Sequence, residues 1–155
     1  MRALVLILGL AACVPVLIPI PMTSVSAPQA RTLAASQAPD TGFEAQLRNV
    51  RSRPIAHNAQ LAAVARAHAA DMVARSYFSH NSPEGVNSGA RAAAVGIPAC
   101  GIGENIAFGQ KSSTEVFAGW MASASHRHNM VNPRMASYGL GRAGNTWVLM
   151  MYQPC

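Results

Sequence analysis

The chain has 155 residues, of which 50% are hydrophobic and 12% are charged, and its formal net charge is +6. This length allows one domain, and the apolar content excludes an intrinsically disordered chain. The positive charge comes from eleven Arg and one Lys against six acidic residues. These basic residues are spread singly instead of being clustered with aromatic residues, so we expect no nucleic-acid partner.

The chain begins with a targeting segment. Arg2 precedes the uninterrupted apolar run 3–10, which is the pattern of a secretory signal peptide. The run is too short to span a membrane before Pro15 interrupts it. We therefore predict a signal peptide over residues 1–30, a flexible tether over 31–41, and export to the periplasm, the cell envelope or the outside.

Two ways of processing this segment remain open. The sequence LAAC at residues 10–13 resembles a bacterial lipobox, in which Cys13 would carry a lipid and become the first mature residue. The alternative is ordinary cleavage among the small residues 23–30. Only the first alternative predicts attachment to a membrane, and that attachment would be through the lipid alone.

The two remaining cysteines suggest a disulfide. Cys13 either leaves with the signal peptide or takes the lipid, and Cys100 and Cys155 are then an even pair in an oxidising compartment. We predict a bridge between them, with two free thiols as the alternative. The bridge would tie the C-terminal residue to the segment just before Glu104.

Two helices are predicted in the first half of the domain. The first runs over about 41–52, and either Asp40 or Thr41 can cap it. The second runs over about 58–75, begins with a capping Asn, and has apolar residues at spacings of three and four. His68 lies on this apolar face, and we interpret it as a core histidine in preference to a ligand.

The middle of the chain contains shorter elements. Residues 81–85 have the composition of a turn, and residues 91–95 suit a short helix. Ser112 and Glu115 form a capping box at the start of a further helix. Residues 123–129 are polar and are predicted to form a turn.

The C-terminal segment changes to a strand pattern. Residues 138–142 form one predicted strand, the pair 144–145 is a Gly-Asn hairpin signal, and residues 146–152 form a second, apolar strand. Helices that flank a small antiparallel sheet define an α+β fold.

Glu104 is the most informative single residue, because it stands among apolar and glycine neighbours in a Gly-Glu-Asn-Ile sequence. Burying a charge requires partners, and His80 and His126 are the expected ones. Glu104 can also accept hydrogen bonds from backbone amides and simply fix the surrounding loops. Asn105 is expected to bond the backbone of its own turn, and His128 is expected to be exposed.

Five blocks of sequence occur in an order that is typical of one family. They are Ala67–Met72, Tyr77–His80, Gly103–Ile106, Trp120–Asn129 and Tyr138–Gly141. The chain resembles the CAP superfamily, which covers cysteine-rich secretory proteins, antigen 5 and plant pathogenesis-related proteins, and within it the small bacterial SCP-like branch.

The resemblance places a CAP or SCP-like domain at residues 42–155. It implies an α-β-α sandwich around a three-stranded antiparallel sheet with a central cleft. We expect this domain to be a monomer.

The resemblance also implies a site in that cleft. In the animal and plant members, two His and two Glu line the cleft and can hold a divalent metal. His80 and Glu104 match the first His and the first Glu. Ser123 stands where the second Glu would be, and Thr146 stands where the second His would be, so half of the set is missing. The bacterial branch has a His after the Trp-bearing helix, which is His126 here.

Three hypotheses about function follow. A metal-dependent hydrolase would bind a divalent cation such as zinc through His80, Glu104 and His126, with Glu104 and His80 as its catalytic candidates. No second carboxylate is evident as a general base, so we prefer a binding module. Its cleft would be formed by His80, Glu104, Asn105, Ser123 and His126, and its ligand would be a lipid, a small molecule or a protein. A structural envelope protein with no small ligand is the third reading.

Overall fold

The structure is a computed structural model that describes residues 38–98 and 100–155. The predicted signal peptide, the predicted lipid on Cys13 and the tether up to residue 37 lie outside the described residues. Within the described ranges, none of the helices has both the length and the apolar character that crossing a membrane requires.

Helices and strands alternate irregularly along the chain. Their order is α2 (Thr41–Asn49), β1 (Ala56–His57), α3 (Ala59–Ala74), α4 (Ser88–Ala94), β2 (Gly101–Phe108), α5 (Ser113–Ala122), α6 (Ala124–Val131), β3 (Ser137–Ala143) and β4 (Thr146–Gln153). The strand order in the sheet is β1-β3-β4-β2. Strands β2, β3 and β4 are antiparallel, as predicted, and the two-residue β1 adds a parallel edge to β3.

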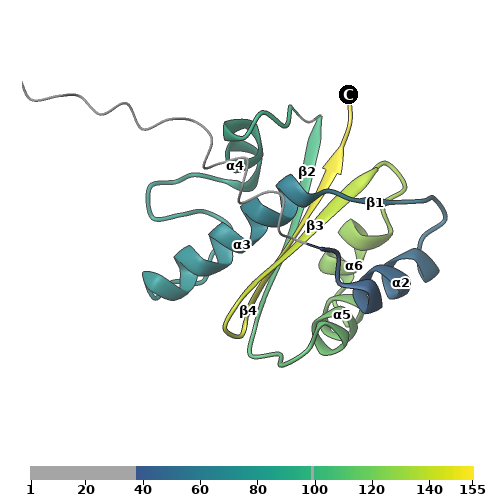
Figure 1. Ribbon diagram of the computed structural model, residues 1–155, viewed down its shortest axis with the longest axis horizontal. Helices are drawn as coiled ribbons and strands as arrows, with labels where there is room; N and C mark the ends of the chain where they lie inside the picture. Colours follow the sequence, from purple (N-terminus) through teal and green to yellow (C-terminus); the bar gives the residue numbers. More distant parts are fainter. Residues whose placement is uncertain (1–37, 99) are drawn as a thin grey trace, which may run out of the picture.

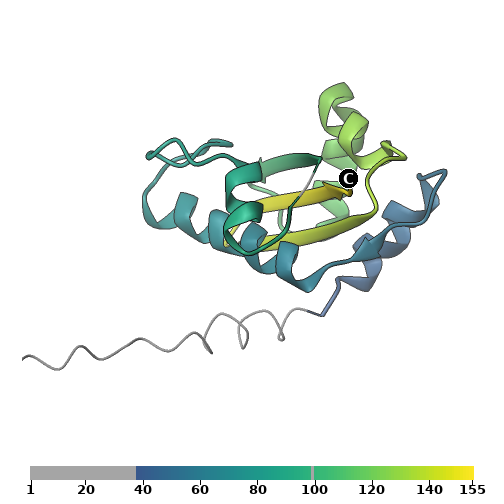
Figure 2. The same cartoon turned by 90° about the horizontal axis from the view of Figure 1, so that it is seen from above.

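The sheet is the middle layer of an α-β-α sandwich, which confirms the predicted fold. Figure 2 shows α3 on one side of the sheet and α5 and α6 on the other. Each face has its own apolar core, and alternate residues of β4 serve the two cores: Val148 and Met150 pack with α3, whereas Leu149 and Met151 pack with α2 and α5. This period of two is what a strand buried on both faces requires.

Two glycines of β3 allow α3 to lie directly on the sheet. A Cβ atom at Gly139 would lie 2.1 Å from the backbone nitrogen of Ala62, and one at Gly141 would lie 2.1 Å from that of Arg66. Any larger residue would therefore push the helix away. The Tyr-Gly-Leu-Gly sequence thus has a packing function as well as a place in the family pattern.

The caps of the helices agree largely with the sequence. Asp40, and not Thr41, caps α2 by accepting a hydrogen bond from the amide of Phe43 at 2.9 Å, and Asn58 caps α3 as predicted. The helix α2 ends at Asn49, three residues before its predicted end. The helix α4 begins at Ser88, earlier than predicted.

The early start of α4 has a local cause. The Asn87 side chain accepts a hydrogen bond from the amide of Ala90 at 2.9 Å and so caps the helix. In α5, Ser112 accepts from the amide of Glu115 as predicted, but the Glu115 carboxylate accepts from the amide of Lys111, one residue before the position of a standard capping box.

Two local predictions were wrong. The loop expected just before Glu104 and the turn expected at Asn105 are parts of strand β2, and residues 124–129 of the predicted polar turn at 123–129 belong to helix α6. Both elements depend on tertiary contacts. Trp120 Nε1 donates to the carbonyl of Ile106 at 3.2 Å, and Asn129 Nδ2 donates to the carbonyl of Glu104 at 3.3 Å. These bonds satisfy carbonyls of an edge strand and hold the helices beside it.

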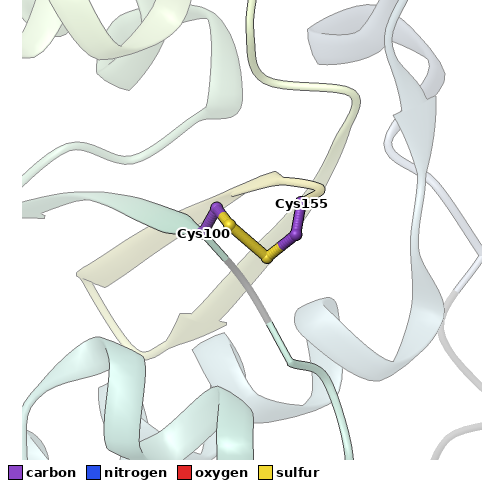
Figure 3. The surroundings of a disulfide bond; sticks show 2 residues. All are labelled: Cys100 and Cys155. Atoms are coloured by element: carbon purple, nitrogen blue, oxygen red, sulfur yellow. A yellow bond between two sulfur atoms is a disulfide. The ribbon is translucent and has the colours of Figure 1, made fainter.

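The predicted disulfide is present. Cys100, just before β2, is bonded to Cys155 at the end of the chain, with the two Cα atoms 4.9 Å apart (Figure 3). The amide of Cys100 also donates to the carbonyl of Gln153 at 3.1 Å. The bridge therefore closes the end of the β2–β4 pair at which β2 begins and β4 ends.

Candidate functional site

The site is built on adjacent residues of β2 that face opposite sides of the sheet. Ile102 and Ile106 pack against the α3 core, so Glu104, which lies between them at a spacing of two, faces the same side. Asn105 faces α6, on the other side. Both residues are buried, with 8% and 0% of their surface exposed.

The Glu104 carboxylate has a partner for each oxygen. Its Oε1 atom lies 2.8 Å from Nδ1 of His80, and its Oε2 atom accepts a hydrogen bond from Nη2 of Arg91 at 2.6 Å. The carboxylate side chain is 3% exposed and that of Arg91 is 12% exposed. A charged acceptor with this little water requires such partners.

Arg91, on α4, is the residue that sequence reasoning missed. Besides Glu104, its guanidinium donates to the carbonyl of Val86 at 2.7 Å and to the carbonyl of His80 at 3.0 Å. Arg91 therefore fixes the Glu104 carboxylate and also the main chain of His80, whose imidazole bonds the same carboxylate. The sequence did contain a hint of this role, because an almost buried carboxylate requires a positive partner. Arg91 is the first residue of the short helix that was predicted just before Glu104.

His80 is the exposed member of this group, with 55% of its side chain accessible. An ionised carboxylate can only accept, so the hydrogen between Nδ1 and Glu104 belongs to the imidazole. In the neutral ring, Nε2 is then an acceptor, and it has no hydrogen-bond partner among residues 38–98 and 100–155. Glu104 and Arg91 thus orient His80 and leave one of its nitrogen atoms available.

The segment that carries His80 begins at a sharp end of α3. Ser76 has a φ of 54°, and the amide of Tyr77 donates to the carbonyl of Met72 at 3.0 Å. The amide of Ser76 donates to the carbonyl of Val73 at 3.3 Å. This is the hydrogen-bond pattern of a Schellman motif, and it turns the chain back along the sheet toward His80.

His68 holds the same segment from below. It is 2% exposed, and its Nε2 lies 3.0 Å from the carbonyl of Ser79, to which it donates. Burial lowers the pKa of His68, and the positive charge of Arg91 lowers it further. The prediction of a core histidine is confirmed, and its hydrogen bond places the residue next to His80.

A second, neutral network lies on the α6 side of β2. Asn105 Nδ2 donates to the carbonyl of His126 at 3.1 Å, and Asn105 Oδ1 accepts from Nδ2 of Asn129 at 2.8 Å. The expectation that Asn105 bonds within its own turn was wrong, because a strand directs this side chain across to α6. Asn129 was also missed by sequence reasoning.

The other predicted cleft residues lie on or near α6. His126 is half-buried, and its pKa is lowered by burial and then by the charge that His80 can carry. Its carbonyl, and not its imidazole, is bonded to β2. Ser123 precedes α6, and its Oγ lies 3.3 Å from Oγ of Ser125. His128 is exposed, as expected.

The side chains do not fit a bound metal as they stand. Over residues 38–98 and 100–155, no three His, Cys, Asp or Glu side chains are grouped so that they would hold an ion. Both Glu104 oxygens are already engaged, one of them by the cation Arg91. A metal on Glu104 would have to share an oxygen with one of these donors or displace it.

Comparisons with known proteins agree with this fold. The family model of the cysteine-rich secretory protein family matches residues 29–151. The uncharacterized protein YkwD of Bacillus subtilis is 37% identical over 97 residues, which cover 61% of this chain and 38% of that protein. The chain therefore spans about two fifths of the length of this curated relative.

Solved structures give the same result. An extracellular protein containing an SCP domain from Bacillus anthracis is 28% identical, with a TM-score of 0.65 over 73% of this chain and 41% of that chain. An outer surface protein from Borrelia burgdorferi shares the fold at 16% identity, with a TM-score of 0.64 over 74% of this chain and 89% of that chain.

Proposed function

Because this chain belongs to the cysteine-rich secretory protein family, we propose that it is an exported SCP-like module that binds a ligand or a protein partner in a cleft centred on His80 and Glu104. Family membership alone does not assign an activity, since one fold can host many functions. The proposal therefore rests on the chemistry of the site.

One observation carries the proposal: Glu104 is fully partnered while His80 keeps one open nitrogen. The Glu104 carboxylate, which has a partner at each oxygen and a side chain only 3% exposed, orients other groups and offers little access to a substrate. The imidazole that it orients is more than half exposed. This arrangement suits recognition of a ligand that offers a hydrogen-bond donor to Nε2 of His80.

Export is supported by two further observations. The Cys100–Cys155 disulfide is typical of an oxidising compartment, and the similar structures come from an extracellular protein and an outer surface protein. The ligand classes to consider are accordingly a lipid, a small molecule or a protein of the cell envelope or its surroundings.

The alternative is a hydrolase that uses a divalent metal such as zinc at His80, Glu104 and His126. It requires a Glu104 oxygen to bind the metal beside or in place of its present partner, and it requires His80, Glu104 and His126 to converge on one point, which they do not do as they stand. Glu104 would then be the catalytic candidate.

The test is an NMR titration of the purified protein with separate panels of envelope saccharides, acyl glycerols and peptides. A ligand of the cleft should shift the ring nitrogen signals of His80, and His80→Ala should weaken its binding by about tenfold, the loss expected for one hydrogen bond of about 1.4 kcal/mol. His128→Ala is the matched control, because this exposed histidine belongs to α6 and has no part in the Glu104 network.

Zinc distinguishes the two functions. Calorimetric zinc binding that is lost in both His80→Ala and Glu104→Gln, together with chelator-sensitive hydrolysis that is lost in Glu104→Gln, would establish the alternative. Ligand binding that is equally strong in His80→Ala would show that the cleft lies elsewhere.

A further inference from the structure

A separate apolar pocket lies beyond the end of α3, on the same face of the sheet as Glu104. Its volume is about 710 Å³, within the range of ligand sites in proteins. The pocket is formed where the C-terminal end of α3 approaches the end of β2 and the start of β4. Figures 1 and 2 both place the end of α3 and the β3–β4 hairpin toward one end of the molecule.

The most exposed large apolar side chains of the described residues gather at this pocket. Phe108 is 69% exposed, Phe78 is 52% exposed and Val73 is 51% exposed, and all three line it. The rings of Phe78 and Phe108 meet edge to face, with their centroids 6.4 Å apart. Exposed aromatic residues around a concave site are typical of recognition surfaces.

The polar groups of the pocket are neutral. Every lining residue is uncharged, and four of them have side-chain hydroxyl or amide groups: Ser76, Tyr77, Gln110 and Thr146. The Tyr77 hydroxyl already donates to the carboxylate of Asp71 at 2.5 Å. The Oε1 atom of Gln110 is buried and has no hydrogen-bond partner among the described residues. Its main-chain carbonyl is fixed by Nε1 of Trp147 at 2.9 Å, so the residue is held at the edge of the pocket.

We propose that this pocket binds an uncharged peptide segment, which packs one aromatic or other large apolar side chain against the contacting rings of Phe78 and Phe108 while Gln110 and Thr146 bond its backbone. A peptide amide offers both a donor and an acceptor, and hydroxyl and carboxamide groups match both. A charged group would find no opposite charge in the lining. Aromatic rings favour a ring packed against them through edge-to-face contacts.

The open shape favours a side chain over a long alkyl chain. Both rim rings are more than half exposed, so an extended alkyl chain would leave much of its length in contact with water. A single ring can instead cover the exposed surfaces of Phe78 and Phe108 together. This inference does not depend on His80, which does not line the pocket.

The proposal is tested by NMR titration of the purified, oxidised protein with N-acetyl-phenylalaninamide. This probe should shift the amide signals of Phe108, Gln110 and Thr146, and it should bind about tenfold more tightly than N-acetyl-glycinamide, which lacks the ring. N-acetyl-phenylalanine, which carries a free carboxylate, should bind more weakly than the amide.

Three variants locate the contacts. Phe108→Ser should lower the affinity for N-acetyl-phenylalaninamide, and Val95→Ser, at an exposed apolar residue away from the pocket, should leave it unchanged. Gln110→Leu should also lower the affinity, yet it should not lower the stability of the free protein, because it removes a buried acceptor that has no partner. His80→Ala should have no effect, which separates this site from the cleft.

Two results would overturn the proposal. If 1-octanol, tested as an alkyl probe without an amide, binds at least as tightly as N-acetyl-phenylalaninamide, the pocket selects alkyl chains. If no probe shifts the pocket signals, or if the shifts survive in Phe108→Ser, the peptide site is elsewhere or absent.

Discussion

The polar network around Glu104 and the one around Asn105 differ in charge and in access to water, although the two residues are neighbours in β2. On the α3 side, a carboxylate joins a guanidinium to an imidazole that is 55% exposed. On the α6 side, two carboxamides and main-chain carbonyls are joined without any charge, and Asn105 is 0% exposed.

The difference teaches which network holds the fold and which is open to a ligand. A neutral, enclosed network has all its partners within the protein, so it fixes α6 against β2 and offers nothing to the outside. The charged network ends in an exposed ring with one free nitrogen. Neighbouring residues of one strand can therefore have different roles, because successive side chains point to opposite faces of the sheet. Here Glu104 orients an exposed histidine, whereas Asn105 holds α6 in place.

The largest expected effect is that of removing the cation from the charged network. Arg91→Met should lower the free energy of unfolding by about 3 kcal/mol, because it leaves a buried carboxylate with a single partner. Urea denaturation at pH 7 measures this loss. Adding Glu104→Gln to Arg91→Met should recover at least ~1 kcal/mol, since the second substitution removes the uncompensated charge.

A double variant that is less stable than Arg91→Met alone would contradict this account. It would mean that Arg91 acts mainly through its bonds to the carbonyls of Val86 and His80, and that the ion pair itself contributes little. Glu104 would then need another explanation for its burial.

The neutral network should be the next most sensitive. Asn105→Ala removes a donor to the carbonyl of His126 and an acceptor for Asn129, which should cost about 2 kcal/mol because buried partners are left unsatisfied. Asn81→Ala, at an exposed asparagine, should change the stability by less than ~0.5 kcal/mol. Equal losses in the two variants would show that the α6 network is not structural.

The sequence predicts the architecture well where local patterns are strong. The caps at Asn58 and Ser112, the hairpin between β3 and β4 and the Cys100–Cys155 pair all follow from short-range rules or from counting. The fold itself was implied by five blocks in the family order. These features could be predicted without knowing which distant segments of the chain contact one another.

The failures share one physical cause. Strand β2 contains two glycines, a charge and an amide, and α6 contains six polar or small residues before Met130, so neither has a strong intrinsic preference. Strand β2 forms because it pairs with β4 along its whole length, and α6 is held against β2 through Asn105 and Asn129. Tertiary contacts of this kind are invisible to a local pattern.

The candidate site was predicted in part for the same reason. A buried carboxylate requires partners, and this rule alone pointed to His80. It did not distinguish Arg91 from the other arginines, because only the fold brings α4 beside β2. The metal hypothesis relied on counting ligand types, and counting could not show that an arginine would occupy one Glu104 oxygen.

The third prediction concerns acid. Burial depresses the pKa of His68 and of His126 below the ordinary value, so the unfolded chain binds a proton first as the pH falls below about 6.5. Stability should therefore be lost from that pH downward, by at most ~1.4 kcal/mol per pH unit for each proton. Urea denaturation between pH 7.5 and pH 5 measures the slope.

His68→Gln tests the part of this effect that comes from the α3 side. Glutamine can still donate to the carbonyl of Ser79 but does not titrate, so the pH dependence should become shallower while stability at pH 7.5 changes little. An unchanged slope would assign the acid sensitivity to His126, and with it to the α6 side of the sheet.

The smallest effect is expected at the residue proposed to matter most for binding. His80→Ala should lower the free energy of unfolding by less than ~1 kcal/mol, because an exposed ion-pair partner contributes little and water can take its place. Glu104 would keep its bond to Arg91. If His80→Ala cost as much as Arg91→Met, the imidazole would be a structural member of the charged network, and the contrast between the two sides of β2 would disappear. We expect His80→Ala to cause a small loss of stability and a large loss of ligand affinity. That combination would show that His80 binds the ligand and does not stabilise the fold.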